Sequence, residues 1–481
     1  MFLLLIVFLN NSCNHHIQEE GINWPENIQI ILDNTTYLEY DRGNRLPLYL
    51  WPAIDPGELD SESAEILVNE LDKRGIGIVS SWNMKNKEEV ISQCITIAKA
   101  QKKLGQRVNV NATSLLYGFY LDDERTAHID ENGNPFFDDS FGSEHKMGCP
   151  FTLDSRKSEI RDRVNYFLSR YKEEGLSVDF IFADWEIDGP IEVNHAYESS
   201  KKCTRCRKHL GDDFSFEEFQ KKIREMRSYL QYYSYSSPIL KCSPDALVGN
   251  YAVYPNDGYR YWYDYFEFLN DNHPHKSEQQ AVYRKWYNDF PLTGYTFAMP
   301  VVYPWWEIFT WYDFENTDYR WFYNMLLNAS NAGKSTPQNI PIIPFVHWNT
   351  IFSGVEPNPN IIQMSENSYQ ELLWHMLLRG CDTFFMWCNK TEFAKETRLV
   401  HEVYAAAQQY GDFLEKGWPI TYDIPNKPGV VISGLALDDR VLIRRTDFGA
   451  NHEPVEILVG TKVVNVKYMP GKCDVIAFQQ E

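Results

Sequence analysis

A regular alternation of short apolar runs with longer helix-like segments constrains this chain more than any other feature of its sequence. A helix-like segment between two strand-like runs indicates a parallel βαβ unit, because a parallel strand needs a long crossover back to the same end of the sheet. Strand-like runs occur at residues 46–51, 77–81, 107–112, 178–184, 238–242, 295–299, 340–346 and 382–387. Helical spacing fills most intervals, at residues 61–74, 88–103, 158–174, 216–232, 319–332, 369–378 and 397–414. This count of units favours a closed (β/α)8 TIM barrel, within the α/β class, over an open sheet.

The pattern changes after Pro425. The β-branched runs that follow are short, are separated by Gly, Asp and Asn, and show no helical spacing; they lie at residues 430–434, 440–445, 455–459 and 462–466. Such runs are typical of a small antiparallel β domain. We therefore expect a catalytic barrel over residues 30–418 and a β-sandwich-like accessory domain over residues 424–481.

The N-terminus begins with nine apolar residues, followed by two asparagines, Ser12 and Cys13. This run is too short to cross a bilayer but has the length of the apolar region of a signal peptide. We expect a signal over residues 1–20, and Ser12-Cys13 resembles the end of a lipoprotein signal, in which Cys13 would carry a lipid anchor. No later run is long enough for a transmembrane helix. The expected location is secreted or membrane-anchored, outside the cytoplasm.

Composition and charge limit the classes of molecule that this protein is expected to bind. The formal net charge of −21 repels phosphate backbones, so a nucleic-acid partner is not expected, and it disfavours a strongly anionic polysaccharide. Aromatic residues make up 15% of the chain, with 14 Trp and 30 Tyr, and aromatic faces stack on sugar rings. An oligosaccharide or polysaccharide partner fits both observations, and we expect no cofactor.

Two acids follow the fourth strand-like run, in the sequence Asp184-Trp185-Glu186. Catalytic residues of a barrel lie at the C-terminal ends of its strands, and alternation along a strand points Asp184 and Glu186 to the same side. Neighbouring carboxyl groups raise one another's pKa, which supplies the protonated acid that a glycosidase needs. A solvated loop of acids is the alternative interpretation, and the position of the pair favours catalysis.

The sequence shows no clear second catalytic carboxylate to work with this pair, so it leaves the mechanism open. Most glycosidases use two carboxylates, but the seventh run ends in His347-Trp348-Asn349 without an acid, and Glu307 is a distant candidate. A lone Asp-x-Glu favours substrate assistance, in which the 2-acetamido oxygen of the sugar attacks the anomeric carbon. Glu186 would then be the general acid/base and Asp184 would support the acetamido group. A two-carboxylate glycosidase and a non-catalytic glycan-binding protein remain the alternatives.

The chain resembles the hyaluronidase family of barrel glycosidases. Its Asp184-Trp185-Glu186 is similar to that family's Asp-Trp-Glu, and three segments resemble the family in the same order, at residues 46–53, 249–255 and 382–387. The resemblance implies an acid/base role for Glu186, a supporting role for Asp184 and substrate contacts by Tyr251, Tyr303 and Trp387. Ile187 replaces the family's second acid, which argues against hyaluronan itself.

Other side chains at or just past the strand ends could hydrogen-bond or stack on a sugar, although inward aromatics also fill barrels. The predicted substrate-binding residues are Tyr251, Tyr303, Trp305, Trp348, Trp387 and Asn389.

The pair Cys203-x-x-Cys206 lies in the loop after the fourth run. It is half of a structural zinc site that Cys149 or His195 could complete. In an exported protein a disulfide is an equal alternative. We expect no catalytic metal.

Overall fold

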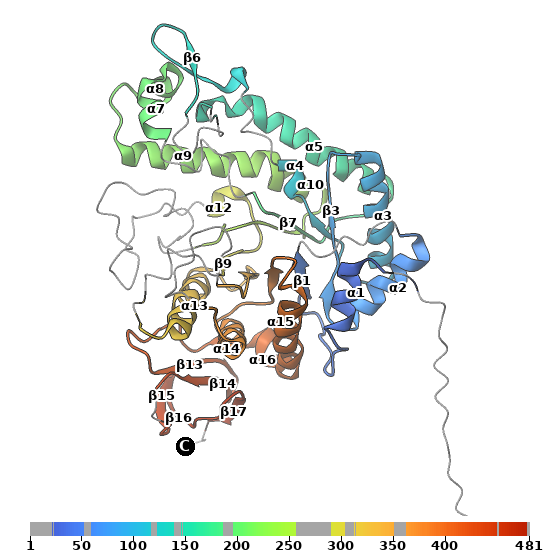
Figure 1. Cartoon of the computed structure of the whole chain (residues 1–481), viewed down its shortest axis with the longest axis vertical. Coiled ribbons are helices and arrows are strands. Elements are labelled where there is room, and N and C mark those ends of the chain that lie inside the picture. Colours follow the sequence, from blue (N-terminus) through green and yellow to red (C-terminus); the bar gives the residue numbers. More distant parts are fainter. Residues whose placement is uncertain are drawn as a thin grey trace, which may run out of the picture.

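The computed structural model describes residues 22, 24–51, 59–116, 123–138, 146, 148–185, 196–255, 290–303, 312, 314–350, 362–449 and 452–478. Its centre is a ring of parallel strands surrounded by helices, and a separate antiparallel unit lies at the C-terminal end (Figure 1). The predicted fold class, a (β/α)8 barrel with a small antiparallel β domain, is confirmed. The predicted signal and Cys13 lie outside the described residues.

The ring strands are β1 (Leu48–Trp51), β2 (Ile76–Gly77), β3 (Val79–Ser81), β4 (Asn109–Asn111), β7 (Phe180–Ala183), β8 (Leu247–Asn250), β9 (Val301–Val302), β10 (Phe345–Val346) and β11 (Phe385–Trp387). Parallel pairing gives the orders β2-β1-β11-β10-β9 and β3-β4-β7-β8. Strands β2 and β3 form one run interrupted at Ile78. The other gap is bridged by Thr296, whose N–H donates to Val248 O at 2.9 Å, and by parallel pairing of Ala298 with Ile342. The ladder therefore closes into a ring.

The helices of the barrel portion are α1 (Glu26–Asp33), α2 (Ser61–Asp72), α3 (Lys87–Lys103), α4 (Thr113–Leu116), α5 (Leu153–Glu173), α7 (Ala196–Lys202), α8 (Thr204–Leu210), α9 (Phe216–Gln231), α10 (Ser237–Cys242), α12 (Phe290–Thr293), α13 (Thr317–Ser335), α14 (Glu366–Leu377), α15 (Phe393–Ala407) and α16 (Gly411–Lys416). Short helical turns are η1 (Glu124–Thr126), η2 (Pro150–Thr152), η3 (Tyr232–Ser236) and η6 (Gln408–Tyr410). Within the part of the chain that the structure describes, no helix has both the length and the apolar character needed to cross a membrane.

Aromatic side chains fill the inside of the ring. Tyr49 on β1 stacks on Phe180 of β7 with ring centroids 4.2 Å apart, and these two strands are not neighbours. Phe182 likewise contacts Phe385 of β11 at 4.2 Å. Both contacts cross the interior, so the even-numbered positions of β7 point inward. The odd positions, including Trp185, pack outward into the apolar layer beneath the helices.

The fifth strand differs from the prediction. Residues 238–242 form helix α10, which continues α9 through the π-helical turn η3, and the strand is β8 at Leu247–Asn250. A short apolar run fits a buried helix as well as a strand, and Pro238 is tolerated in the first turn of a helix. Gly249 allows the true strand to approach its neighbour, because a Cβ there would lie 2.4 Å from the ring of Phe297.

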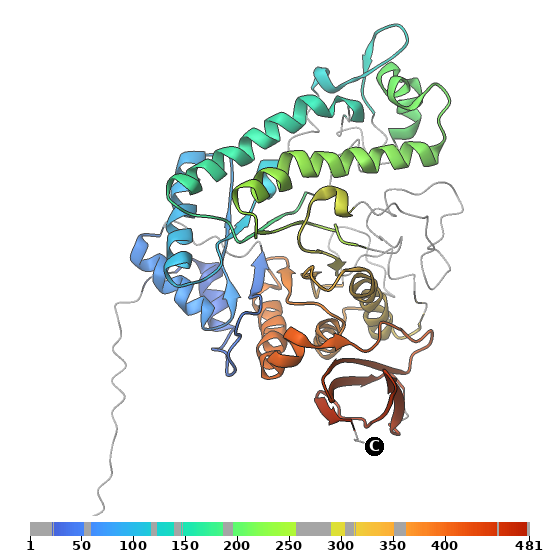
Figure 2. The ribbon, with the colours of Figure 1, turned by 180° about the vertical axis from the view of Figure 1, so that it is seen from behind.

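The C-terminal unit is built from two antiparallel sheets. One has the order β12-β13-β14-β17, and β15 pairs with β16. Their bounds are β12 (Trp418–Pro419), β13 (Val430–Leu437), β14 (Arg440–Asp447), β15 (Val455–Val459), β16 (Lys462–Val466) and β17 (Cys473–Ala477). Val441, Ile443, Val459, Val464 and Val466 form the apolar core between them. Seen from behind, this unit lies beside α13 and α14 at the edge of the barrel (Figure 2).

Buried polar contacts join this unit to α14. Arg444 Nε donates to Glu371 Oε2 at 3.0 Å, and Arg379 Nε donates to Ser433 Oγ at 2.8 Å. His375 lies between Ser433 Oγ at 2.7 Å and Thr446 Oγ1 at 2.9 Å and is completely buried. The two units are therefore joined through a hydrogen-bonded interface.

This interface predicts a pH dependence of stability. Burial, together with Arg379 and Arg444, lowers the pKa of His375 well below its ordinary value. Below about pH 6.5 the imidazole of His375 binds a proton in the unfolded chain but not in the folded one. The contribution of His375 to the free energy of unfolding is therefore fully present above that pH and is lost as the pH decreases. We measure the free energy of unfolding in urea as the pH is lowered below about 6.5. We expect its slope in His375→Gln to be shallower than in the unchanged protein, and the two slopes to differ by up to about 1.4 kcal/mol per pH unit. Equal slopes in His375→Gln and in the unchanged protein would contradict the prediction.

Candidate functional site

Inward side chains at the C-terminal strand ends form a second tier above the aromatic interior. Because side chains alternate, the residue two positions beyond an inward-facing residue also points inward. We call this tier the mouth, and define it by Trp51, Asp184, Tyr251, Tyr303, His347 and Trp387. Asp184 follows Phe182 in this way and is half-buried.

The backbone at Asp184 is held from both neighbouring strands. Its N–H donates to Thr113 Oγ1, just past β4, at 2.8 Å. On the other side, the N–H of Trp185 donates to Asn250 Oδ1 at 2.9 Å, and Asn250 Nδ2 donates back to Trp185 O at 3.3 Å. Asn250 is completely buried, so this paired contact is shielded from water. The backbone of Asp184 and Trp185 is therefore fixed by its neighbours. Glu186 lies outside the described residues.

Aromatic rings surround the mouth. Tyr251 and Tyr303 share a hydrogen bond between their hydroxyl groups, and both side chains are buried. The Tyr303 ring lies 6.0 Å from that of Trp387, with the ring planes 32° apart. Trp51 contacts Phe182 edge-on at 5.8 Å. Trp51 and Trp387 are partly exposed, so their surfaces are accessible from the end of the barrel.

The remaining predicted contact residues lie elsewhere. Trp348 follows the inward His347 and is buried on the other side of the strand, where its indole N–H donates to Met364 O at 2.9 Å. Asn389 is exposed, two residues past β11. Trp305 and the alternative acid Glu307 lie outside the described residues. The structure thus brings Asp184, Tyr251, Tyr303 and Trp387 into one tier.

Sequence reasoning missed a buried carboxylate behind the seventh strand. Glu396, on α15, accepts hydrogen bonds from His347 Nδ1 at 2.8 Å, from the Trp348 N–H at 2.7 Å and from the Tyr369 hydroxyl at 2.9 Å. Both Glu396 and His347 are completely buried. Glu396 lies 49 residues beyond His347 in the sequence, so no local motif joins them.

The pair fixes the orientation of the imidazole. With Nδ1 bonded to Glu396, His347 Nε2 is buried and has no hydrogen-bond partner among the described residues. The same ring contacts Trp387 edge-on at 4.9 Å and Tyr303 at 6.3 Å. Burial raises the pKa of Glu396, and the neighbouring His347 opposes that shift. The carboxylate therefore fixes the histidine ring against those of Trp387 and Tyr303.

The cysteine pair acquires two partners in the structure. Cys203 and Cys206 lie beside Cys149 and His128, and all four side chains are buried. Cys149 is one of the two completions considered from the sequence, and His195 lies outside the described residues. His128 was not anticipated, because it comes from the strand β5 (His128–Ile129), far from the cysteines along the chain.

No protein-family model and no curated protein matches the sequence. Among solved structures, the GH36 alpha-galactosidase AgaA from Geobacillus stearothermophilus is 10% identical with a TM-score of 0.45, over 92% of this chain and 57% of that one. Isomaltulose synthase from Klebsiella sp. LX3 is 10% identical with a TM-score of 0.39, over 90% and 97%. A glycoside hydrolase family 5 protein from Bacteroides vulgatus is 12% identical with a TM-score of 0.34, over 92% and 90%. This chain thus spans little more than half the length of the alpha-galactosidase. Structural similarities this distant give no information about the activity of this chain.

Proposed function

We propose that this protein is a glycoside hydrolase that cleaves a glycan containing 2-acetamido sugars at the mouth of its barrel. The observation that supports the proposal best is Asp184, a half-buried carboxylate at the inward end of β7. Its N–H donates to Thr113, and the backbone of the next residue, Trp185, is held by Asn250. Carboxylates at this end of a barrel strand are where glycosidase chemistry occurs. The aromatic side chains of the mouth offer faces on which a sugar can stack.

In the proposed mechanism the substrate supplies the nucleophile. Its acetamido oxygen attacks the anomeric carbon while Glu186 donates a proton to the departing glycosidic oxygen, and the carbon–oxygen bond breaks. Asp184 accepts a hydrogen bond from the acetamido N–H and stabilises the positive charge of the cyclic intermediate. Water then adds to the anomeric carbon as Glu186 takes its proton, which regenerates the acetamido group and retains the configuration.

The described strand ends favour this mechanism over one with two carboxylates. Apart from Asp184, neither the last residue of any described ring strand nor the described residue after it is an acid. Glu396 is completely buried behind His347 and is engaged by three hydrogen bonds, so it is a positioning residue. Tyr251 and Tyr303 are proposed to bind the reacting sugar. His347, held by Glu396, is proposed to position the rings of Tyr303 and Trp387 that it contacts. Trp305 and Asn389 are proposed as outer contacts.

The finer parts of the proposal come from the sequence. The hyaluronidase-like Asp184-Trp185-Glu186 suggests the acetamido sugar, and the apolar N-terminus suggests export, with a lipid anchor on Cys13. The net charge of −21 favours a neutral or weakly charged glycan.

The test is a digestion of paired substrates that differ only in the group at position 2 of the sugar. We expect mass spectrometry to detect cleavage of 2-acetamido glycans, and the matching 2-hydroxy glycans to react slower by about three orders of magnitude, because they lack the tethered nucleophile. Equal cleavage of both would support a two-carboxylate glycosidase instead. Binding without cleavage of any member of the panel would support a non-catalytic glycan-binding protein.

A further inference from the structure

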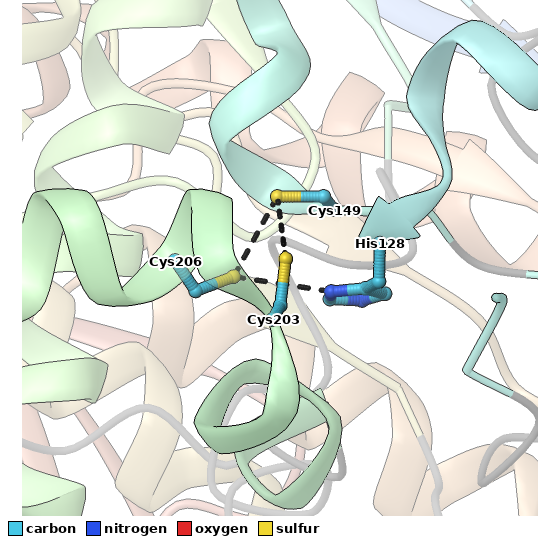
Figure 3. A group of neighbouring side chains, drawn as sticks. All are labelled: His128, Cys149, Cys203 and Cys206. Carbon is cyan, nitrogen blue, oxygen red and sulfur yellow. Dashed lines mark hydrogen bonds between the residues drawn. The ribbon is translucent and has the colours of Figure 1, made fainter. Parts of the chain in front are cut away.

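We propose that His128, Cys149, Cys203 and Cys206 bind one structural zinc ion that joins the loops following the third and fourth strands of the barrel. His128 and Cys149 belong to the segment between β4 and α5, and Cys203 and Cys206 belong to the segment between β7 and α9. The four side chains converge on a common point from these two segments (Figure 3).

The spacing of the donor atoms fits a tetrahedral ion. Cys149 Sγ lies 3.5 Å from Cys206 Sγ and 3.9 Å from Cys203 Sγ, and Cys206 Sγ lies 3.9 Å from His128 Nδ1. Zinc bonds of about 2.3 Å to sulfur and about 2.0 Å to nitrogen give tetrahedral edges of about 3.8 Å between sulfurs and about 3.5 Å from sulfur to nitrogen. All four donor atoms lie within 4.8 Å of one another. The cluster therefore has the donor set and the dimensions of a Cys3His zinc site.

The same distances disfavour a disulfide, the alternative that the sequence left open. A disulfide bond is about 2.05 Å long, whereas the two measured sulfur separations are 3.5 and 3.9 Å and the cysteines are free. Three thiols also cannot all pair with one another. A zinc ion engages all three, together with the imidazole.

The surroundings lack the apolar core that would otherwise hold this region together. The unit consists of η1, β5, β6 (Pro135–Phe136), η2, α7 and α8. Its apolar cluster has only the three cysteines as fully buried members among the described residues, with Phe136, Phe151 and Leu210 packed around them. Small units without a sufficient core commonly rely on a structural metal or on disulfides. Zinc would supply the missing stabilisation here.

One hydrogen bond within the first segment and one between the two segments help to place the four ligands close together. The Cys149 N–H donates to Thr126 O at 2.6 Å, and Gly148 permits this approach, because a Cβ there would lie 2.3 Å from the same oxygen. Arg205 Nη1, on α8, donates to Ala127 O at 2.8 Å. Helix α8 is thereby held against the strand that carries His128.

The histidine is not explained by ordinary packing. His128 is completely buried, and its Nδ1 faces the thiols, with Cys206 Sγ at 3.9 Å. Its ring stacks on Phe136 at 5.1 Å, which fixes the plane of the imidazole. Buried polar groups in proteins nearly always have a partner, so a buried imidazole beside three thiols points to metal ligation.

The ion would have a structural role. Four protein ligands fill a tetrahedral zinc site and leave no open position for a substrate or water. The unit nevertheless lies close to the mouth along the chain, because α7 begins at Ala196, ten residues after Glu186. Zinc would therefore anchor the far end of the segment that leaves the mouth.

The test is the metal content of the full-length protein, purified under reducing conditions from zinc-supplemented cells. We expect about one zinc per chain by mass spectrometry of the metal, as for other closed four-ligand sites. Cobalt(II) exchanged into the site should produce thiolate-to-cobalt charge-transfer absorption. Metal-free protein that takes up neither zinc nor cobalt stoichiometrically would overturn the proposal, as would a disulfide among Cys149, Cys203 and Cys206.

Variants give a second readout that does not depend on any enzymatic activity. Cys206→Ser and His128→Ala should weaken zinc binding at least 100-fold in competition with a chromogenic chelator. Matched controls are Cys94→Ser, a buried cysteine in another core, and Cys242→Ser, an exposed one. These controls should keep one zinc per chain; equal zinc affinity in all four variants would contradict the ligand set.

Discussion

Replacing Glu186 by glutamine is expected to lower kcat by about 10³-fold to 10⁴-fold, close to the full contribution of a positioned general acid/base. Glutamine keeps the size and the hydrogen-bonding capacity of the side chain but cannot give a proton to the departing sugar oxygen. Because the substrate contacts remain, the dissociation constant of an unhydrolysed glycan should change only a few-fold. Steady-state kinetics and calorimetric binding on the same glycan test both expectations.

Glu198→Gln is the matched control. Glu198 is an exposed acid on α7 that pairs with Lys201 at the protein surface. Its replacement should leave both kcat and binding unchanged. A Glu186→Gln enzyme with full turnover would remove Glu186 from the mechanism.

Replacing Glu396 by alanine is expected to cost about 3–5 kcal/mol of unfolding free energy, one of the largest losses a single substitution gives. The change strips three buried donors of their acceptor: His347 Nδ1, the Trp348 N–H and the Tyr369 hydroxyl. Each donor left without a partner costs roughly 1–3 kcal/mol, because it has lost its hydrogen bond to water as well. Unfolding in urea, followed by tryptophan fluorescence, measures the loss.

Two further variants separate this effect from a general loss of charge. Glu396→Gln keeps the two acceptor contacts of Oε1, so its loss should be about 1–2 kcal/mol. Glu402→Gln removes an exposed acid of the same helix that pairs with Arg398, and should change stability by less than about 0.5 kcal/mol. If Glu396→Ala were no less stable than Glu402→Gln, the buried hydrogen bonds would not contribute as we infer.

The sequence pattern predicted the helices and strands in which buried and exposed residues alternate with a regular period. The alternating β-branched runs at 455–459 and 462–466 are the strands β15 and β16, and the helical spacing at 61–74 contains α2. In these segments one face packs and the other is solvated, so the periodicity is visible in the sequence. The run at 238–242 is buried and too short to show a period, and it was assigned to the wrong class of element.

A residue named from the sequence lies in the mouth where its place on the strand determines that position. Asp184, Tyr251 and Tyr303 directly follow strand ends and Trp387 ends β11, so the barrel geometry brings them together. Trp348 also follows a strand end, but it is one position out of phase and is buried on the other side of the strand. Asn389 lies beyond the strand and is exposed.

By itself the sequence determined the parallel barrel, the antiparallel C-terminal unit and the position of an acid at the end of the fourth strand, because each follows from spacing along one segment. Only the tertiary structure decided which distant side chains meet. It placed Glu396 behind His347 across 49 residues, and it brought His128 to cysteines as far as 78 residues away. Such contacts depend on how the helices and loops pack around the ring, and packing of that kind leaves no period or motif in the chain.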